Sequence, residues 1–232
     1  MVQRRLCFEL CVHALPDCGV GFWLWILVDD IPSTDSTGSR KLKGMKHFTE
    51  SELFAQLAAQ SVLPILRFDA SVDGYRFCEH LIAHGFLILE ITMTSHRALD
   101  LIQRLTRAGY CTGVGTLYTV EQAQTALDHG AAFLVSPGLN LDIAALAQQV
   151  NVPYFPGVFT PTEVLSAYNA GLRSLKLFPA STVGPAYLKH FAGPFPGLKW
   201  LPTGGIAFDD VAGYLEAGAL VVGFGRFGQT VA

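Results

Sequence analysis

The feature of this 232-residue sequence that most limits its fold is a regular alternation of short apolar runs with helix-like segments. From residue 62 onward, apolar runs begin at intervals of about 20 to 25 residues, close to the shortest repeat that holds a strand, a helix and two loops. Such an alternation predicts a parallel sheet, because each helix carries the chain back to the start of the next strand. The eight predicted strands are 62–67, 87–92, 111–116, 131–136, 152–158, 174–178, 198–203 and 219–225.

The segments between these runs carry the boundary residues of helices. Thr160 precedes Pro161, and Glu163 stands at the third helical position, which predicts a capping box. Glycines follow several of the other expected helix ends. The predicted helices are 72–84, 96–108, 120–129, 142–149, 161–170, 185–191 and 209–217, with an extra helix at 49–60 that closes the floor of the sheet.

Eight parallel strands favour a closed (β/α)8 barrel of the TIM type over an open sheet, because closure leaves no unpaired strand edge. The expected fold class is therefore α/β, with residues 45–232 forming one barrel domain. The last helix of such a barrel has no counterpart in the pattern, because the chain ends seven residues after the last predicted strand. We therefore expect a barrel whose final helix is missing.

Residues 1–44 lack the periodicity of the rest of the chain. Their apolar stretch, 21–28, is shorter than the about 20 residues that cross a bilayer, and polar residues interrupt any signal-peptide core. The polar stretch 29–43 follows, and the regular pattern begins at Met45. We expect residues 1–44 to be a disordered or spurious N-terminal extension outside the barrel, and a tail that lies on a membrane surface is the alternative.

Composition narrows the classes of partner. Half of the residues are hydrophobic and 15% are charged, against roughly 25% in an average domain, which favours a large core and an oligomer. The net charge is −3 and the sixteen basic residues are scattered, so we expect no nucleic acid and no membrane as partner. Five unevenly spaced cysteines predict no disulfide framework and favour a reducing, cytoplasmic setting.

No metal site is expected from the spacing of metal-binding residue types. His80 and His84 are four residues apart on a predicted helix, but Leu81 stands where a zinc protease of the HExxH type carries glutamate. Cys111 begins a predicted strand and is expected to be a packed thiol. The closest group of candidates lies near the N-terminus and matches none of the common zinc-ligand spacings: Cys7, Cys11, His13 and Cys18.

Lys176 lies within an apolar strand that stops at Pro179. An ammonium group in a buried strand has to lose its water, and lysine is rarely buried without a functional reason. Burial lowers the pKa of the amine from about 10.4 towards about 7 to 8, where the neutral amine attacks carbonyl groups. A lysine that extends from the strand end to solvent is the alternative, and this stretch alone does not decide between them.

Polar residues also end other predicted strands, and in a barrel the strand ends meet at one mouth. Glu90 alternates with Leu89 and Ile91, so a Glu90 that points into the barrel leaves these two side chains to pack against helices. The alternative to a catalytic pair is a buried ion pair in which Lys176 and Glu90 only satisfy each other. Besides Lys176, the strand-end polar residues are Arg67, Glu90, Thr92, Thr116, Ser136 and Thr203.

Glycines follow the last two predicted strands. Gly204 and Gly205 come after the seventh strand, and Gly225 comes after the eighth. Barrels commonly bind phosphate at these two loops, where glycine lets backbone N–H groups approach the oxygen atoms. Arg226 adds a guanidinium group, so we expect a phosphate site there.

With these residues in place, the segment from about Ser61 to Arg226 resembles the family of 2-keto-3-deoxy-6-phosphogluconate and 2-keto-3-deoxy-6-phosphogalactonate aldolases. The similar stretches occur in family order across the predicted barrel. They are 63–67 (LPILR), 90–92 (EIT), 113–116 (GVGT), 136–138 (SPG), 156–158 (PGV), 175–180 (LKLFPA), 184–189 (GPAYLK) and 202–205 (PTGG).

The resemblance implies a class I aldolase that needs no metal or other cofactor, acts on a phosphorylated keto acid and forms a homotrimer of barrels. It implies Lys176 as the Schiff-base lysine and Glu90 as the proton shuttle. The implied phosphate-binding residues are Gly204, Gly205 and Gly225, with Arg226 beside them. The candidate substrate-binding residues are Arg67, Thr92, Thr94, Thr116, Gly157 and Phe178.

Two departures from the family pattern bear on substrate preference. Gluconate-type members carry an arginine four residues after the glutamate to hold the substrate carboxylate, and this position is Thr94 here. Arg67 ends the first strand as in galactonate-type members and supplies a charge instead. Arg226 stands where family members often have serine. The preferred C4 epimer therefore stays open.

The expected reaction is cleavage of a 2-keto-3-deoxy-6-phospho sugar acid to pyruvate and glyceraldehyde 3-phosphate. One alternative is an aldolase for 4-hydroxy-2-oxoglutarate, which uses the same lysine and glutamate without a phosphate. Another is a phosphosugar isomerase or epimerase, which keeps the glycine loops and does not need the lysine. The third is a non-catalytic, truncated barrel fragment.

Overall fold

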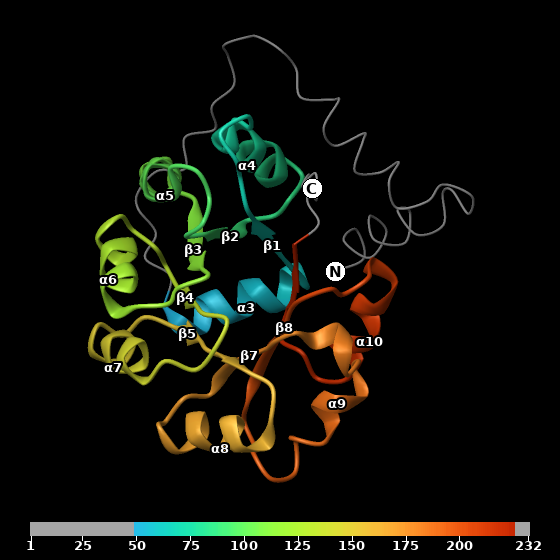
Figure 1. Cartoon of the computed structure of the whole chain (residues 1–232). Helices are drawn as coiled ribbons and strands as arrows, with labels where there is room; N and C mark the ends of the chain where they lie inside the picture. Colours follow the sequence, from blue (N-terminus) through green and yellow to red (C-terminus); the bar gives the residue numbers. More distant parts are fainter. Residues whose placement is uncertain (1–48, 226–232) are drawn as a thin grey trace, which may run out of the picture. The chain divides into compact units, whose positions relative to one another are not determined.

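Helices alternate with parallel strands throughout residues 49–225, the part of the chain that the computed structural model describes (Figure 1). The helices are α3 (Glu50–Gln60), α4 (Gly74–Ala83), α5 (Ala98–Arg107), α6 (Val120–Asp128), α7 (Leu141–Gln149), α8 (Pro161–Asn169), α9 (Ala186–Lys189) and α10 (Val211–Glu216). The strands are β1 (Val62–Leu66), β2 (Ile88–Thr92), β3 (Cys111–Gly115), β4 (Leu134–Val135), β5 (Tyr154–Phe155), β6 (Gly157–Val158), β7 (Ser174–Leu177), β8 (Lys199–Pro202) and β9 (Val222–Phe224). The expectations for residues 1–44, for Arg226 and for a missing final helix concern residues outside the described part.

The described strands pair in parallel in two sheets, with the orders β5-β4-β3-β2-β1-β9 and β6-β7-β8. The chain runs from β5 into β6 across Pro156, and single bridges join Trp200 to Ala219 and Thr203 to Gly223 beside β8 and β9. The strands therefore follow one another around a ring. This is an α/β fold like that of a TIM barrel.

Three predicted strands are shorter than expected. The segment 152–158 is divided into β5 and β6, because Pro156 has no N–H group to donate to a neighbouring strand. Its carbonyl still accepts a 2.9 Å hydrogen bond from the backbone N–H of Lys176. The segment 131–136 keeps only Leu134–Val135 as β4, and the predicted helix 185–191 keeps only α9. The last predicted strand, 219–225, keeps only Val222–Phe224 as β9, and the other described elements match the predictions within about two residues at each end.

The interior of the ring is apolar at one end. α3 crosses the middle of the ring in Figure 1 and presents Leu53, Phe54 and Leu57 to the strands. This bears out the prediction that the helix at 49–60 closes the floor. We call this cluster the floor; its strand residues are Leu63, Ile88, Cys111, Phe133, Val135, Phe155, Leu201 and Val221. Full burial of one leucine such as Leu57 stabilises the fold by roughly 1.5–3 kcal/mol.

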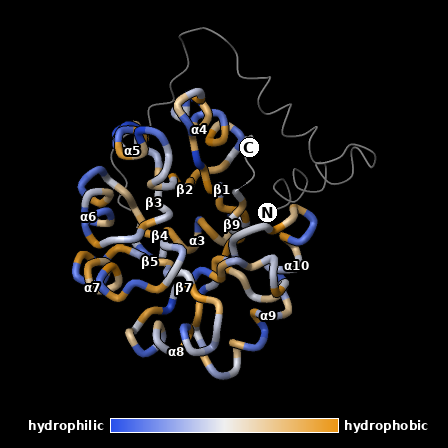
Figure 2. The backbone as a smooth tube through the Cα atoms, viewed as in Figure 1, coloured by the Kyte–Doolittle hydropathy of each residue, from blue (hydrophilic) through white to orange (hydrophobic). Residues whose placement is uncertain are grey.

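The outward faces of the strands pack against the surrounding helices, as strand alternation requires. Leu89 and Ile91 of β2, and Leu175 and Leu177 of β7, belong to this outer layer. Figure 2 shows the same division on the helices, whose outer surfaces carry most of the hydrophilic residues. The residues between these positions in each strand, Glu90 and Lys176, are therefore the ones that face the interior.

Loops join the strand ends to the helices that follow, and capping residues fix where some of these helices begin. The predicted capping box of α8 is present: Glu163 N–H donates to Thr160 Oγ1 at 3.4 Å, and Thr160 N–H donates to Glu163 Oε2 at 2.8 Å. Thr119 and Gln122 form the same motif at the start of α6. Within residues 49–225, no helix has both the length and the apolar character that a membrane span requires.

Candidate active site

β7 places Lys176 in the interior of the ring. The side chain is 6% exposed, and strand pairing aligns Lys176 with Gly157 of β6 and with Leu201 of β8. Its amine lies 5.1 Å from the centre of the Phe178 ring, two residues further along the same face. A lysine that extends to solvent is therefore excluded. The side chain is instead an amine held among protein groups at the end of a strand.

β2 places Glu90 in the same interior, where its side chain is fully buried. Strand pairing aligns it with Ile65 of β1 and with Gly113 of β3. Neither carboxyl oxygen has a hydrogen-bond partner among residues 49–225. A buried carboxyl group without partners costs free energy, which favours a functional role over a structural one.

Glycines in β3 make the room that Glu90 occupies. A Cβ atom at Gly115 would overlap Oε1 of Glu90. A Cβ atom at Gly113, two residues earlier on the same face, would overlap the ring of Phe133 in the floor. Gly115 therefore adjoins the buried carboxyl of the site, whereas Gly113 adjoins the floor.

Burial controls the charge of both buried groups. It raises the pKa of the Glu90 carboxyl and lowers the pKa of the Lys176 amine, and in each case the mutual attraction of the two charges opposes it only in part. Neither Glu90 nor Lys176 takes part in the ion pairs found within residues 49–225, which join Arg76 to Asp73 and Arg97 to Asp100. The interpretation as a self-satisfying Lys176–Glu90 ion pair is therefore wrong. Burial thus shifts both groups towards their neutral forms.

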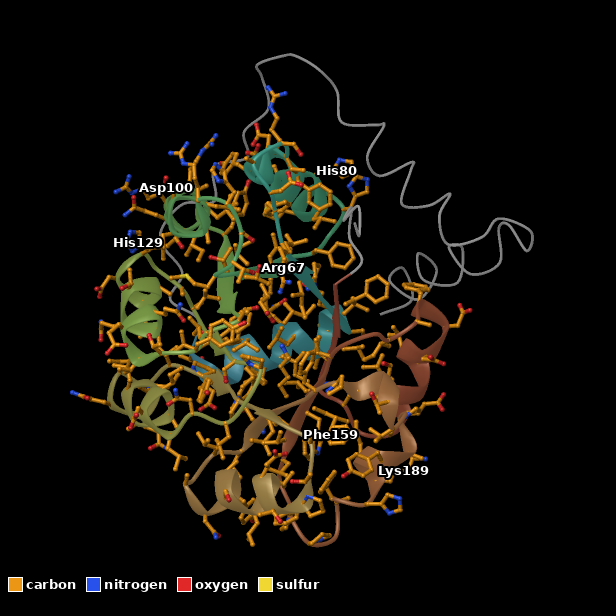
Figure 3. The ribbon with its side chains drawn as sticks, in the orientation of Figure 1. Arg67, His80, Asp100, His129, Phe159 and Lys189 are labelled. Atoms are coloured by element: carbon orange, nitrogen blue, oxygen red, sulfur yellow. The ribbon has the colours of Figure 1, made fainter. Side chains whose placement is uncertain are left out.

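Arg67 follows β1 directly and lies near the centre of the ring in Figure 3, whereas His80, Asp100 and Lys189 lie on the outer helices. Its positive charge favours the Glu90 carboxylate and disfavours the Lys176 ammonium, so the three groups lie within electrostatic reach of one another. The arginine is exposed, as a group that receives a ligand from solvent must be.

The remaining candidate substrate-binding residues occupy the same end of the strands. Thr92 ends β2 and is 1% exposed, and Thr116 follows β3 with a left-handed φ of 61°. Gly157 is buried beside Lys176, and a Cβ atom there would overlap the carbonyl oxygen of Pro137. Thr94 is exposed and donates a 3.2 Å hydrogen bond to Thr92. It therefore lies at the exposed rim, bonded to the buried Thr92.

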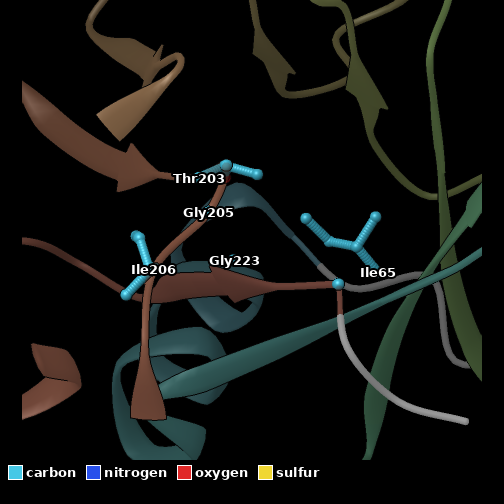
Figure 4. A pocket seen from close by; sticks show the side chains of 7 residues that line it. Ile65, Thr203, Gly205, Ile206 and Gly223 are labelled. Atoms are coloured by element: carbon cyan, nitrogen blue, oxygen red, sulfur yellow. The ribbon is translucent and has the colours of Figure 1, made fainter. Parts of the chain in front are cut away.

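A cavity of about 190 Å³ lies beside the two glycine loops (Figure 4). Gly204 and Gly205 adopt φ values of 99° and 71°, which side chains rarely allow, so their backbone can lie open to a ligand. Ile65, which pairs with Glu90 in the sheet, also lines the cavity, so the cavity extends to the strand next to β2. The lining residues are Ile65, Thr203, Gly204, Gly205, Ile206, Gly223 and Gly225.

The loop after β7 is bonded to the loop after β8. Ala180 N–H donates to Thr203 O at 2.8 Å, and Ser181 N–H donates to Gly204 O at 3.1 Å. The ring of Phe178 lies 2.8 Å from where a Cβ atom of Gly204 would stand. These contacts therefore join the loop that follows the Lys176 strand to the loop that lines the glycine cavity.

The other candidates from the sequence lie away from this end of the ring. His80 and His84 stack with ring centres 4.3 Å apart on α4, and residues 49–225 contain no group of three or more His, Cys, Asp or Glu side chains that could hold a metal ion. Cys111 is 5% exposed in the floor, and burial raises its pKa to about 12, so it is a packed thiol as predicted. The N-terminal cysteines lie outside the described residues.

Sequence reasoning overlooked Ser95, which is 7% exposed in the middle of the loop between β2 and α5. It also overlooked Ile65 and Ile206 as walls of the cavity. A serine five residues after a strand glutamate has no sequence pattern that marks it. Ile65 and Ile206 have ordinary core character.

A ring of parallel strands with a buried amine, a buried carboxyl and a glycine-lined cavity at one end defines a TIM-barrel-like protein with an enzyme-type site. Residues 54–230 match the family model described as KDPG and KHG aldolase. The chain belongs to this family.

Particular relatives agree with this assignment. A Pseudomonas aeruginosa protein named 2-dehydro-3-deoxy-phosphogluconate aldolase is 38% identical over 157 residues, which cover 66% of this chain and 71% of the relative. A solved structure of KDPG aldolase from Legionella pneumophila, with pyruvate captured as a covalent carbinolamine intermediate, has a TM-score of 0.69 and 30% identity, covering 73% of this chain and 84% of the other. A structure described as the 4-hydroxy-2-oxoglutarate aldolase/2-deydro-3-deoxyphosphogluconate aldolase from TTHB1 has a TM-score of 0.68 and 40% identity, covering 78% and 88%.

Proposed function

We propose that this protein is a class I aldolase that cleaves a 2-keto-3-deoxy-6-phospho sugar acid to pyruvate and glyceraldehyde 3-phosphate. The observation that carries the proposal is the buried Lys176, whose pKa burial lowers towards the neutral amine, in the same ring interior as the buried Glu90. Such an amine attacks a ketone, whereas an exposed ammonium does not. A family member with pyruvate captured as a covalent carbinolamine supports the same chemistry.

In the first half of the reaction, Lys176 adds to the C2 ketone and forms a carbinolamine. Burial raises the pKa of Glu90 and so favours its protonated form, which would give its proton to the departing C2 hydroxyl group. Water leaves, and an iminium cation forms on Lys176. The new positive charge stabilises the Glu90 carboxylate that has just formed.

In the second half, the Glu90 carboxylate takes the proton of the C4 hydroxyl group, directly or through a water. The C3–C4 bond breaks, glyceraldehyde 3-phosphate leaves, and the bonding electrons move into the iminium to give an enamine of pyruvate. Protonation at C3 and hydrolysis then release pyruvate and the free amine. One carboxyl group thus serves as acid and then as base.

Two regions of the site would hold the ends of the substrate. Arg67 would bind the carboxylate with its guanidinium fork, with Thr92, Thr94 and Thr116 at the rim. The glycine cavity would bind the phosphate through backbone N–H groups of Gly204 and its neighbours. Binding energy at both ends would then position the C3–C4 bond between lysine and glutamate.

The test is to trap the imine. The protein is incubated with pyruvate and borohydride, weighed by mass spectrometry and digested to find the modified peptide. We expect one reduced pyruvate on Lys176. Lys176→Met should abolish the adduct, whereas Lys189→Met, the same change on the exposed end of α9, should leave it unchanged. An adduct that persists in Lys176→Met would contradict the proposal.

A non-phosphorylated substrate, 4-hydroxy-2-oxoglutarate, is the second candidate, and the KHG part of the family description favours it. The comparison is between kcat/KM values on the two substrates. A working phosphate site in the glycine cavity should favour the phosphorylated sugar acid strongly. Equal values would assign the chain to the non-phosphorylated substrate. An isomerase or epimerase would turn over without Lys176, so the Lys176→Met variant separates that reading too.

We also propose that the protein works as a homotrimer in the cytoplasm and that residues 1–44 are dispensable for catalysis. The family match begins at residue 54, exposed apolar residues such as Tyr118 and Leu141 suit an interface, and the buried Cys78 and Cys111 are free thiols. Light scattering should give three times the mass of one chain, and a chain that begins at Met45 should keep the activity. Aggregation without a cooperative thermal transition would support the truncated-fragment alternative.

A further inference from the structure

Ser95 bonds to both peptide groups that flank Arg67. The backbone N–H of Phe68 donates to Ser95 Oγ at 3.2 Å, and Ser95 Oγ donates to the carbonyl oxygen of Leu66 at 3.3 Å. The serine is 7% exposed, so water does not readily replace these bonds. One hydroxyl group from the β2 loop thus holds the residue before and the residue after the arginine.

This attachment begins where the strand pairing stops. The last aligned pair of β1 and β2 is Leu66 with Ile91, so the backbone of Arg67 lies beyond the strand pairing. The Ser95 hydroxyl continues the link between the two chains past the end of the strands. A backbone bond from His96 N–H to Phe68 O, at 2.8 Å, lies beyond it and does not depend on the serine side chain.

The serine is itself oriented by neighbouring hydroxyl groups. Its single hydrogen goes to Leu66 O, so in the 3.1 Å contact between Thr92 Oγ1 and Ser95 Oγ the threonine is the donor. Thr92 in turn accepts a hydrogen bond from Thr94. The hydroxyl groups therefore donate hydrogen bonds in one direction, from the exposed Thr94 through Thr92 and Ser95 to the backbone carbonyl before Arg67.

We propose that Ser95 is a positioning residue for Arg67, which fixes the guanidinium over the mouth and so sets the affinity for the substrate carboxylate. The inference rests on the proposed function, because it needs a carboxylate ligand at Arg67. It explains how a threonine at position 94 remains compatible with carboxylate binding: the loop holds an arginine from the neighbouring strand in place of carrying its own.

The test compares carboxylate-dependent with carboxylate-independent trapping. In Ser95→Ala, the pyruvate concentration that half-saturates borohydride trapping on Lys176, and KM in the cleavage assay, should rise about tenfold, with kcat within about threefold of wild type. Trapping of acetone, a ketone without a carboxylate, should be unchanged. Ser95→Thr keeps the hydroxyl group and should restore the wild-type values.

A control for general loosening is Thr106→Val. Thr106 Oγ1 donates a 3.1 Å hydrogen bond to Gly130 O, which joins α5 to the turn after α6, outside the site. This variant loses a bond of the same kind and should keep the wild-type KM. If it raises KM as much as Ser95→Ala does, the positioning role is refuted.

A double-mutant cycle with Arg67→Met decides whether Ser95 acts through the arginine. In the Arg67→Met background, Ser95→Ala should add no further increase in KM, because the group it positions is gone. Additive effects, an equal loss of acetone trapping, or an unchanged KM in Ser95→Ala would each overturn the inference. If Ser95→Ala does not fold, the cycle is run with Ser95→Gly and Ser95→Cys.

The failure of this inference differs from the failure of the proposed function. Absence of any pyruvate adduct in the wild-type protein contradicts the aldolase proposal. A normal adduct with an additive cycle contradicts the role of Ser95 alone.

Discussion

The floor and the mouth of this ring are built from the same strands, but the floor buries apolar side chains and the mouth buries ionisable ones. In the floor, Leu57 meets Phe133 and Phe155, all of them fully buried and apolar. A few residues further along the same strands, Glu90 and Lys176 are buried to nearly the same degree without an ion pair or a hydrogen bond to each other. Equal burial therefore has opposite consequences for stability at the two ends.

The comparison indicates a division of work along each strand. Apolar burial in the floor and in the outer layer supplies the free energy that holds the ring together. The mouth costs free energy, because burial disfavours the charged forms of both Glu90 and Lys176. Mutations in the floor should therefore lower stability with little effect on catalysis, and mutations in the mouth should do the reverse.

The largest effect is expected from Lys176→Met. Loss of the amine should lower kcat/KM for sugar-acid cleavage by about 10⁴-fold or more, since no other group forms the iminium. Replacement of a buried amine by an apolar side chain of similar size should raise the urea midpoint. Lys189→Met should change neither quantity. A large loss of stability in Lys176→Met would contradict the assignment of the lysine to the costly end of the ring.

Leu57→Ala should produce the opposite pattern. The leucine is fully buried in the floor, so the free energy of unfolding should fall by roughly 2–5 kcal/mol. Urea denaturation measures this change. The kcat/KM of the molecules that remain folded should stay within about threefold of wild type. A loss of catalysis greater than the loss of folded protein would show that the two ends are coupled.

A pair of glycines in β3 sharpens the boundary between the two regions. Gly115→Ala places a Cβ atom against Oε1 of Glu90, so the carboxyl should move and kcat should fall by about 10²-fold. Gly113→Ala places the same atom against the buried ring of Phe133, so it should chiefly lower stability. Steady-state kinetics and urea melts on both variants separate the two outcomes. If both variants lose stability and activity to the same extent, the boundary between floor and mouth does not lie between Gly113 and Gly115.

The smallest effect is the pH dependence of Glu90→Gln. Folding raises the pKa of this carboxyl, so its contribution to stability is fully present below its ordinary value of 4.5 and is lost as pH rises through the raised value. Glutamine does not titrate. The variant should therefore gain stability relative to wild type as pH rises above 4.5. Urea melts of the wild type and the variant at pH 5 and pH 8 check this. An equal change in the stability of the two proteins between these pH values would show that ionisation of Glu90 does not lower stability.

Much of the fold could be predicted because each element depends on local rules. The spacing of the apolar runs predicted the strands, and the Thr160–Glu163 capping box located the start of α8. The fifth predicted strand is divided at Pro156, because proline has no N–H group to donate. How strongly a proline interrupts a strand depends on whether the neighbouring strand needs that N–H group as a donor. Only pairing in three dimensions answers that question.

The candidate site divides in the same way. Strand alternation placed Glu90 on the face opposite Leu89 and Ile91, and the structure buries it there, whereas the burial of Lys176 was left open by its own stretch of sequence. Their charge states could not be predicted, since the outcome depends on how far burial outweighs the attraction of the two groups and on where Arg67 lies. The role of Ser95 was equally hidden, because its partners are 27 and 29 residues away.

The sequence by itself determined the kind of element at each position, the face on which each strand residue lies, and a family whose motifs occur in order. These properties depend on periodicity and on neighbours a few residues away. The tertiary structure alone decided which distant groups meet, such as glycine against carboxyl at Gly115 and serine against the backbone around Arg67. Such contacts depend on the twist and closure of the ring, and no short stretch of sequence encodes them.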